Sequence, residues 1–154
     1  MYDLLLFAHS WLRWLVLLAA LAALARAIGG VNTRRPWTPV DDRAGVWLTA
    51  ALDLQMLIGL ILYIFLSPVT QSAFVDMAAA MRAAPVRFFT VEHPVGMIVS
   101  IALAHIGRAR VRKAADSESK HKQALIFFGL SLLVLLLSIP WPIGLGARSL
   151  FRGL

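Results

Sequence analysis

Residues 4–25 read LLLFAHSWLRWLVLLAALAALA, a run of 22 residues interrupted only by His9, Ser10 and Arg13. A helix of this length crosses the hydrocarbon core of a bilayer, which is about 30 Å thick. Backbone N–H and C=O groups cannot stay unpaired in lipid, so such a segment must be helical. No basic stretch precedes it, and it is too long for the apolar part of a signal peptide. We therefore interpret it as a retained transmembrane helix.

Three further apolar stretches follow, at 45–66, about 88–107 and about 124–139. Together they predict an all-α fold, a four-helix up-down bundle with both cytoplasmic connections short. The expected unit is a single integral membrane domain over 1–154, with helices over about 4–28, 45–66, 91–112 and 120–139.

A semi-apolar connection separates the second and third helices. Phe74, Met77, Ala78 and Met81 recur in it at helical spacing. This pattern predicts one short amphipathic helix on the outer surface, ended by Pro85.

The composition agrees with a membrane protein. Of the 154 residues 60% are hydrophobic and only 15% are charged, which is more apolar than ordinary soluble domains. The formal net charge of +7 is explained by membrane topology and anionic headgroups, so no nucleic-acid partner is expected. The chain has no cysteine, which excludes disulfides, thiolate metal sites and covalently attached haem.

Basic residues indicate the orientation. Ten of them lie in the two connections expected on one side: Arg26, Arg34, Arg35, Arg43, Arg108, Arg110, Arg112, Lys113, Lys120 and Lys122. The other side has four, namely Arg82, Arg87, Arg148 and Arg152. The positive-inside rule therefore predicts a multi-pass protein of the bacterial inner membrane with both termini in the periplasm.

Two histidines are expected at matched depth. His9 lies five residues after Leu4 and His93 five after Phe88, so both would sit about 7–8 Å below the outer interface. Their helices run in the same direction. Two such imidazoles could ligate the iron of one b-type haem, or they could be interfacial residues satisfied by water.

Small residues and cations surround this pair in the sequence. Gly96 and Ser100 lie on the His93 face of the third helix, where they could admit a flat cofactor or serve helix packing. Arg13 shares the face of His9 and needs a carboxylate partner, such as Glu92 or a haem propionate. Arg87 is a second cation within reach of a propionate. Alternatively, both arginines anchor at the interface.

Other polar residues have weaker indications. His105 is expected to hydrogen-bond within the bundle or to meet a partner, and His121 to be solvated at the cytoplasmic turn. Asp53 and Gln55 point in different directions from the second helix, which indicates a partner helix or a quinone headgroup. Thr90 is expected to cap the third helix, with Pro94 in its first turn.

Three motifs carry a family resemblance: HSWLRW at 9–14, RFFTVEHP at 87–94 and IPWP at 139–142. The whole chain resembles small four-helix bacterial inner-membrane proteins labelled cytochrome b. The resemblance implies a b-type haem protein of electron transport, with His9 and His93 as the positions to carry over. Where a further histidine is expected in the second helix, this chain has Asp53, so no ligand is expected there.

Two functional hypotheses result. The first is an electron carrier with one haem b near the periplasmic face, its iron held by His9 and His93, which passes electrons between quinol and a partner complex or a soluble periplasmic carrier. The second is a cofactor-free accessory subunit of a larger respiratory or photosynthetic membrane complex. Both favour a carrier or subunit over a stand-alone enzyme. A transporter is disfavoured because the sequence has no inverted repeat.

Overall fold

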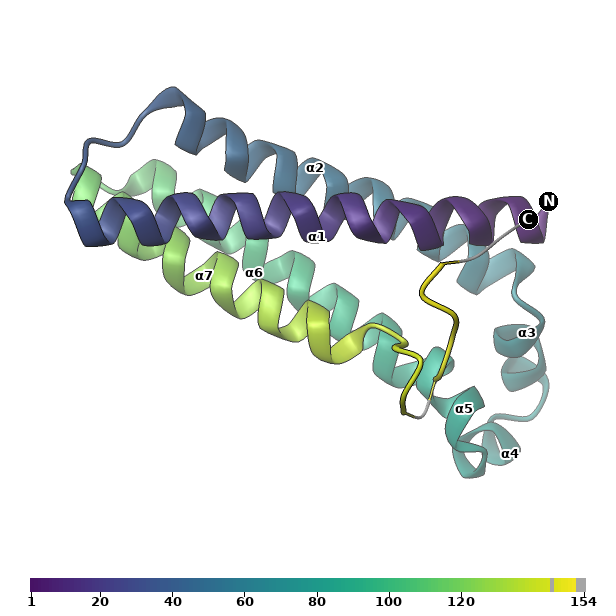
Figure 1. Cartoon of the computed structure of the whole chain (residues 1–154). Coiled ribbons are helices and arrows are strands. Elements are labelled where there is room, and N and C mark those ends of the chain that lie inside the picture. The colour runs from purple at the N-terminus through teal and green to yellow at the C-terminus, as the bar shows by residue number, and fades with distance from the viewer. Residues whose placement is uncertain (145, 152–154) are drawn as a thin grey trace.

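The computed structural model describes residues 1–144 and 146–151, and within them it is helical without strands. Four long helical segments run alternately up and down (Figure 1). They are α1 (Tyr2–Thr33), α2 (Pro39–Ile61) with the π-helical turn η1 (Leu62–Leu66), α5 (Ala84–Arg87) with η2 (Phe88–Glu92) and α6 (His93–Lys113), and α7 (Ser117–Ser138). All four are long and apolar enough to cross a membrane. The predicted all-α bundle of four transmembrane helices is confirmed.

The long helices pack in a ring. Helix α1 contacts α2 and α7, and α6 contacts the same two helices from the opposite corner. Small residues bring the backbones together, as is typical of membrane helices. Between α6 and α7, Ser100 and Ser131 exchange hydrogen bonds: each hydroxyl donates to the other's carbonyl, at 2.9 and 2.8 Å. Because α1 and α6 lie at diagonal corners, their inner faces point towards each other across the bundle.

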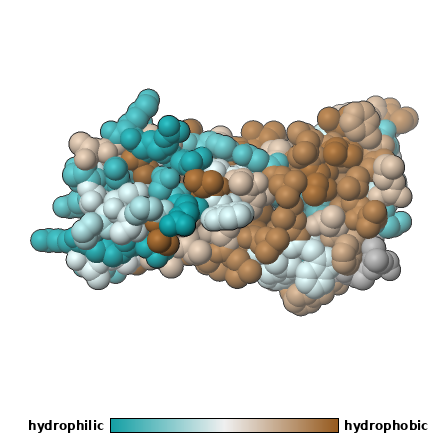
Figure 2. Space-filling model, turned by 90° about the horizontal axis from the view of Figure 1, so that it is seen from above, coloured by the Kyte–Doolittle hydropathy of each residue, from teal (hydrophilic) through white to brown (hydrophobic). Residues whose placement is uncertain are grey.

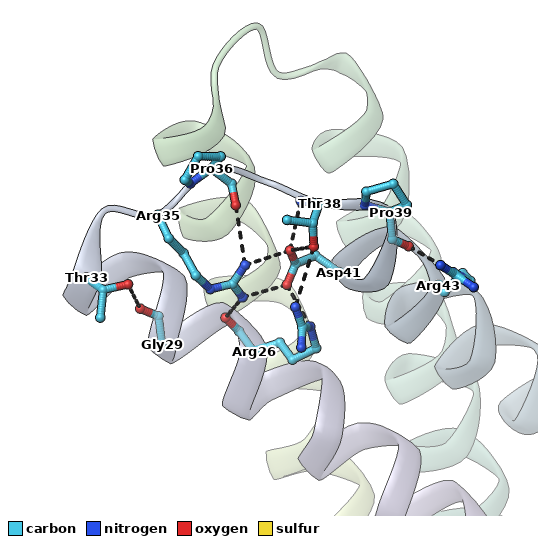
Figure 3. A network of polar contacts seen from close by, with 9 residues as sticks. All are labelled: Arg26, Gly29, Thr33, Arg35, Pro36, Thr38, Pro39, Asp41 and Arg43. Carbon is cyan, nitrogen blue, oxygen red and sulfur yellow. Dashed lines mark hydrogen bonds and ion pairs between the residues drawn. The ribbon is translucent and has the colours of Figure 1, made fainter.

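Helix α2 begins at Pro39, six residues before the predicted apolar run. Thr38 and Asp41 form a capping box, and Asp41 also accepts hydrogen bonds from Arg26 at 2.8 Å and from Arg35 at 2.6 Å (Figure 3). The carboxylate is buried, with 3% of Asp41 exposed. Hydrogen bonding to Asp41 raises the pKa of the Arg35 guanidinium above its ordinary value. This network fixes the connection between α1 and α2.

The segment between the second and third spans forms two short helices rather than the single one predicted. They are α3 (Pro68–Val75) and α4 (Met77–Arg82). Asp76 separates them, because its side chain accepts a hydrogen bond from the Ala79 N–H at 2.8 Å and so begins a new helix. Pro85 then lies in the first turn of α5, where a missing N–H costs nothing.

The start of the third span also differs from the prediction. Helical structure begins at Ala84, so Pro94 lies well inside the span and Thr90 does not cap it. Pro94 has no N–H to donate to the Thr90 carbonyl four residues earlier. The Tyr63 hydroxyl donates to this carbonyl instead, at 2.9 Å, and the chain adopts the π-helical turn η2 just before His93. The helix therefore continues through Pro94 although one backbone hydrogen bond is missing.

Hydrophilic residues gather at one end of the molecule, around the α1–α2 and α6–α7 connections, whereas apolar residues cover most of the rest of the visible face (Figure 2). This end carries the ten basic residues counted above. The helices thus present an apolar belt with one strongly basic end.

Candidate functional site

His9 and His93 lie next to each other inside the bundle, at the end away from the basic connections. Their ring centroids are 6.3 Å apart and the ring planes make an angle of 74°. His9 projects from α1 and His93 from the start of α6, the two helices at diagonal corners. The sequence predicted matched depth, and the structure brings the two rings together.

The His93 ring has a fixed orientation. Its Nδ1 lies 2.8 Å from the carbonyl oxygen of Ser138. A carbonyl can only accept, so Nδ1 carries the proton and Nε2 of the neutral ring keeps a free lone pair. Metal-ligating histidines commonly show this arrangement, because the hydrogen bond sets both tautomer and ring orientation.

The IPWP motif explains why the Ser138 carbonyl is free. Helix α7 ends at Ser138 because Ile139, which precedes Pro140, is extended, so no helical N–H reaches the Ser138 carbonyl. Pro140 likewise frees the carbonyl of Leu136, which accepts the Trp141 indole N–H at 2.7 Å. The motif therefore both ends the helix and provides an acceptor for His93.

His9 is held from α2. The Gln55 side chain donates to the His9 carbonyl at 2.9 Å. Gly59 gives the ring its room, because a Cβ at this position would lie 3.1 Å from Cε1 of His9. The Nδ1 atom of His9 and the Oε1 atom of Gln55 are buried and have no hydrogen-bond partner among the residues that the structure describes. Gly59 was not among the predicted residues, although a glycine in an apolar helix is typical of a close contact between helices.

Both histidines line a cavity of about 160 Å³. Its walls come from α1, α2, η1, α3, η2, α6 and α7, and the terminal segment contributes Arg148 and Ser149. A cavity of about 150 Å³ is large enough for benzene. The terminal segment crosses from the end of α7 towards α1 (Figure 1), and Phe151 stacks on Trp14 with centroids 5.5 Å apart. Residues 148–151 thus lie across the site, which no motif predicted.

The two arginines predicted at the site have different environments. Arg13 lines the cavity, is 8% exposed and donates to the Leu150 carbonyl at 2.7 Å. Its Nε has no partner within residues 1–144 and 146–151. Arg87 instead forms an ion pair with Glu92 at 2.7 Å and does not line the cavity. Glu92 is therefore committed to Arg87 and is not the partner of Arg13. The second cation at the cavity is Arg148.

Gly96 and Ser100 do not form a groove at the cavity. A Cβ on Gly96 would collide with the Ser138 side chain, and Ser100 is fully buried against Ser131. The small residues of α6 are used to pack this helix closely on α7, which is the second of the two explanations given above. Gly96, Ser100 and Arg87 do not line the cavity beside His9 and His93, and their role in holding a cofactor stays a prediction.

The remaining histidines lie elsewhere. His105 forms a hydrogen bond with Asp53 at 2.8 Å, between α6 and α2, as one of the two sequence interpretations expected. His121 was expected to be solvated, but it is fully buried. Its ring fills the space that Gly30 leaves and lies 4.9 Å from the ring of Trp37. Helix α7 begins at Ser117, so His121 is already inside the bundle.

Within residues 1–144 and 146–151, no group of three or more His, Asp or Glu side chains is arranged to hold a metal. The cavity is lined by two imidazole rings, by Arg13 and Arg148, and otherwise mostly by apolar groups. A bare metal ion needs four or more ligands in most protein sites, whereas a tetrapyrrole brings four of its own. Comparison with protein-family models, curated proteins and solved structures returns no match.

Proposed function

We propose that His9 and His93 hold the iron of one b-type haem and that the protein transfers electrons within the bacterial inner membrane. The observation that carries this proposal is the spacing of the two rings, 6.3 Å between centroids. With metal–nitrogen bonds of about 2 Å and ring nitrogens about 1 Å from the ring centre, two axial imidazoles are separated by about 6 Å. The free Nε2 of His93 supports the same assignment.

The chain's other residues would complete the site. Arg13 and Arg148 are suited to the two propionates, because paired charges are the least costly way to keep cations inside a membrane. A tetrapyrrole is several times larger than benzene, so the proposal includes displacement of residues 149–151 from the cavity, while Arg148 stays beside it. When bound, the iron would supply reversible one-electron oxidation and reduction. Quinol and a periplasmic carrier or membrane complex are the proposed partners, with both termini in the periplasm.

A second candidate is a cofactor-free accessory subunit of a larger membrane complex. The benzene-sized cavity and the lipid-facing pair of Asp53 and His105 favour it. The first observation would mean that no haem enters. The second would mean that another subunit covers this part of the bundle.

Haem content separates the two candidates. The protein should be produced with ample haem supply, purified in detergent, and compared with the variants His9→Ala and His93→Ala. We expect about one haem per chain in the wild type and almost none in either variant. His105→Ala is the matched control, because it removes a histidine far from the cavity. A wild-type protein without haem would favour the accessory subunit.

A further inference from the structure

The pair formed by Asp53 and His105 lies on the lipid-facing surface of the bundle. Asp53 is near the middle of the span Pro39–Leu66, and 53% of its side chain is exposed, as is 48% of the His105 side chain. Polar groups in the hydrocarbon region are costly and normally face the interior. Other polar side chains of the spans follow this rule, for Thr49, Ser100 and Ser131 are all at most 3% exposed. The exposed pair therefore needs an occupant that covers it.

We propose that a second copy of this chain covers the face formed by α2 and α6, and that Asp53 and His105 join the two copies. This proposal is independent of haem binding. The bond within one copy uses Oδ1 of Asp53 and Nε2 of His105. It leaves Oδ2 and Nδ1 for another group. In the ion-pair form the imidazolium carries N–H groups on both nitrogens, so Nδ1 can donate once more.

A donor and an acceptor side by side make this surface self-complementary. Copies inserted in the same orientation are related by a two-fold axis along the membrane normal, which exchanges left and right. Such an axis beside the pair places His105 opposite the partner's Asp53, and Asp53 opposite the partner's His105. The two imidazole rings and the two carboxyl groups then form a closed cluster of hydrogen bonds. A single copy leaves half of these hydrogen-bonding sites in lipid.

Small side chains allow the close approach that this arrangement requires. Ala50 precedes Asp53 by three residues on α2, and Ala102 and Ala109 flank His105 at three and four residues on α6; all three are exposed. Positions three and four apart share one helix face. Exposed small residues beside a polar group are typical of helix interfaces in membranes. A foreign helix would need a matching donor and acceptor at the same depth, whereas the second copy brings them by symmetry.

The absence of cysteine allows a direct test, because a single introduced thiol reports only on itself. Ala50→Cys, Ala102→Cys and Ala109→Cys should each be reconstituted as purified protein in phospholipid vesicles and oxidised with copper phenanthroline. Disulfides form only where Cα atoms come within about 7 Å, so only positions near the axis can react. Leu130→Cys on α7 is the control, because Leu130 is 44% exposed to lipid on another helix.

We expect at least one of the three alanine positions to give a cross-linked dimer and Leu130→Cys to remain monomeric. Adding Asp53→Ala should lower the cross-linked fraction about tenfold, since two symmetric interhelical hydrogen bonds are lost. Helicity and vesicle insertion of each variant show that it folds. The proposal is overturned if none of the three positions exceeds the control, in which case a different subunit covers the face. It is equally overturned if cross-linking persists without Asp53.

Discussion

At the scale of single residues, the site depends on hydrogen-bonding groups that prolines leave unpaired. Pro140 ends helix α7, so the Ser138 carbonyl is free to orient His93, and Tyr63 donates to the Thr90 carbonyl that Pro94 leaves unpaired. The equal depth of His9 and His93 could be predicted from the sequence, because helical rise is constant. The side chains that surround the two histidines could not be predicted, because they depend on the angles at which the helices cross.

Gly59 provides the sharpest test of the His9 environment. In Gly59→Ala, the new Cβ would lie 3.1 Å from Cε1 of His9, so the ring must move by a few tenths of an ångström. We expect haem affinity to fall about tenfold, as is typical when the support of a metal ligand is disturbed. Haem titration of the apoprotein measures this. Gly29→Ala is the control, because nothing lies within 4 Å of its Cβ; equal affinities of the two variants would contradict the assignment.

At the scale of elements, the four spans could be predicted because twenty apolar residues in lipid have one backbone solution. The ends of the spans were harder to predict. Helix α2 begins as early as Pro39, because Thr38 and Asp41 cap it there. The third span begins at Ala84, because the π-helical turn η2 keeps the chain helical up to Pro94, which lacks an N–H. These starts depend on side-chain contacts between elements, which hydropathy does not report. The terminal segment was missed because its contacts to Trp14 and Arg13 are tertiary.

The connection between α1 and α2 should depend strongly on Asp41. Asp41→Asn removes the negative charge that Arg26 and Arg35 share and weakens the capping box. We expect a loss of about 2 kcal/mol in the free energy of unfolding, from one cap and from charged hydrogen bonds that are partly open to solvent. Denaturant titration in detergent measures it. The neighbouring Asp42→Asn should change stability little, and a similar loss in both variants would argue against the network.

The terminal segment should limit access to the cavity. Phe151→Ala removes the stack on Trp14, at 5.5 Å, and so weakens the hold on residues 149–151. An aromatic stack contributes about 1 kcal/mol, so we expect haem affinity to rise about fivefold. Phe65→Ala is a matched control, because Phe65 is 70% exposed and does not line the cavity. Haem affinity that falls in Phe151→Ala would mean that this segment supports the site instead of closing it.

At the scale of the whole molecule, one end of the bundle is hydrophilic (Figure 2) and carries the two basic connections. The cavity lined by His9 and His93 lies towards the other end. The positive-inside rule predicts that the basic end lies in the cytoplasm. Alkaline phosphatase fused to the C-terminus should therefore be active, and the same reporter inserted between residues 114 and 116 should be inactive. The reverse pattern would move the cavity to the cytoplasmic face and exclude a periplasmic electron partner.

The central claim is that both imidazoles ligate one iron. Electron paramagnetic resonance of the oxidised, haem-loaded protein tests it most directly, because two axial histidines give a low-spin ferric centre. We predict a low-spin signal in the wild type that is lost in both His9→Ala and His93→Ala and retained in His105→Ala. A high-spin signal in the wild type, or a low-spin signal that survives the loss of either histidine, would contradict the assignment.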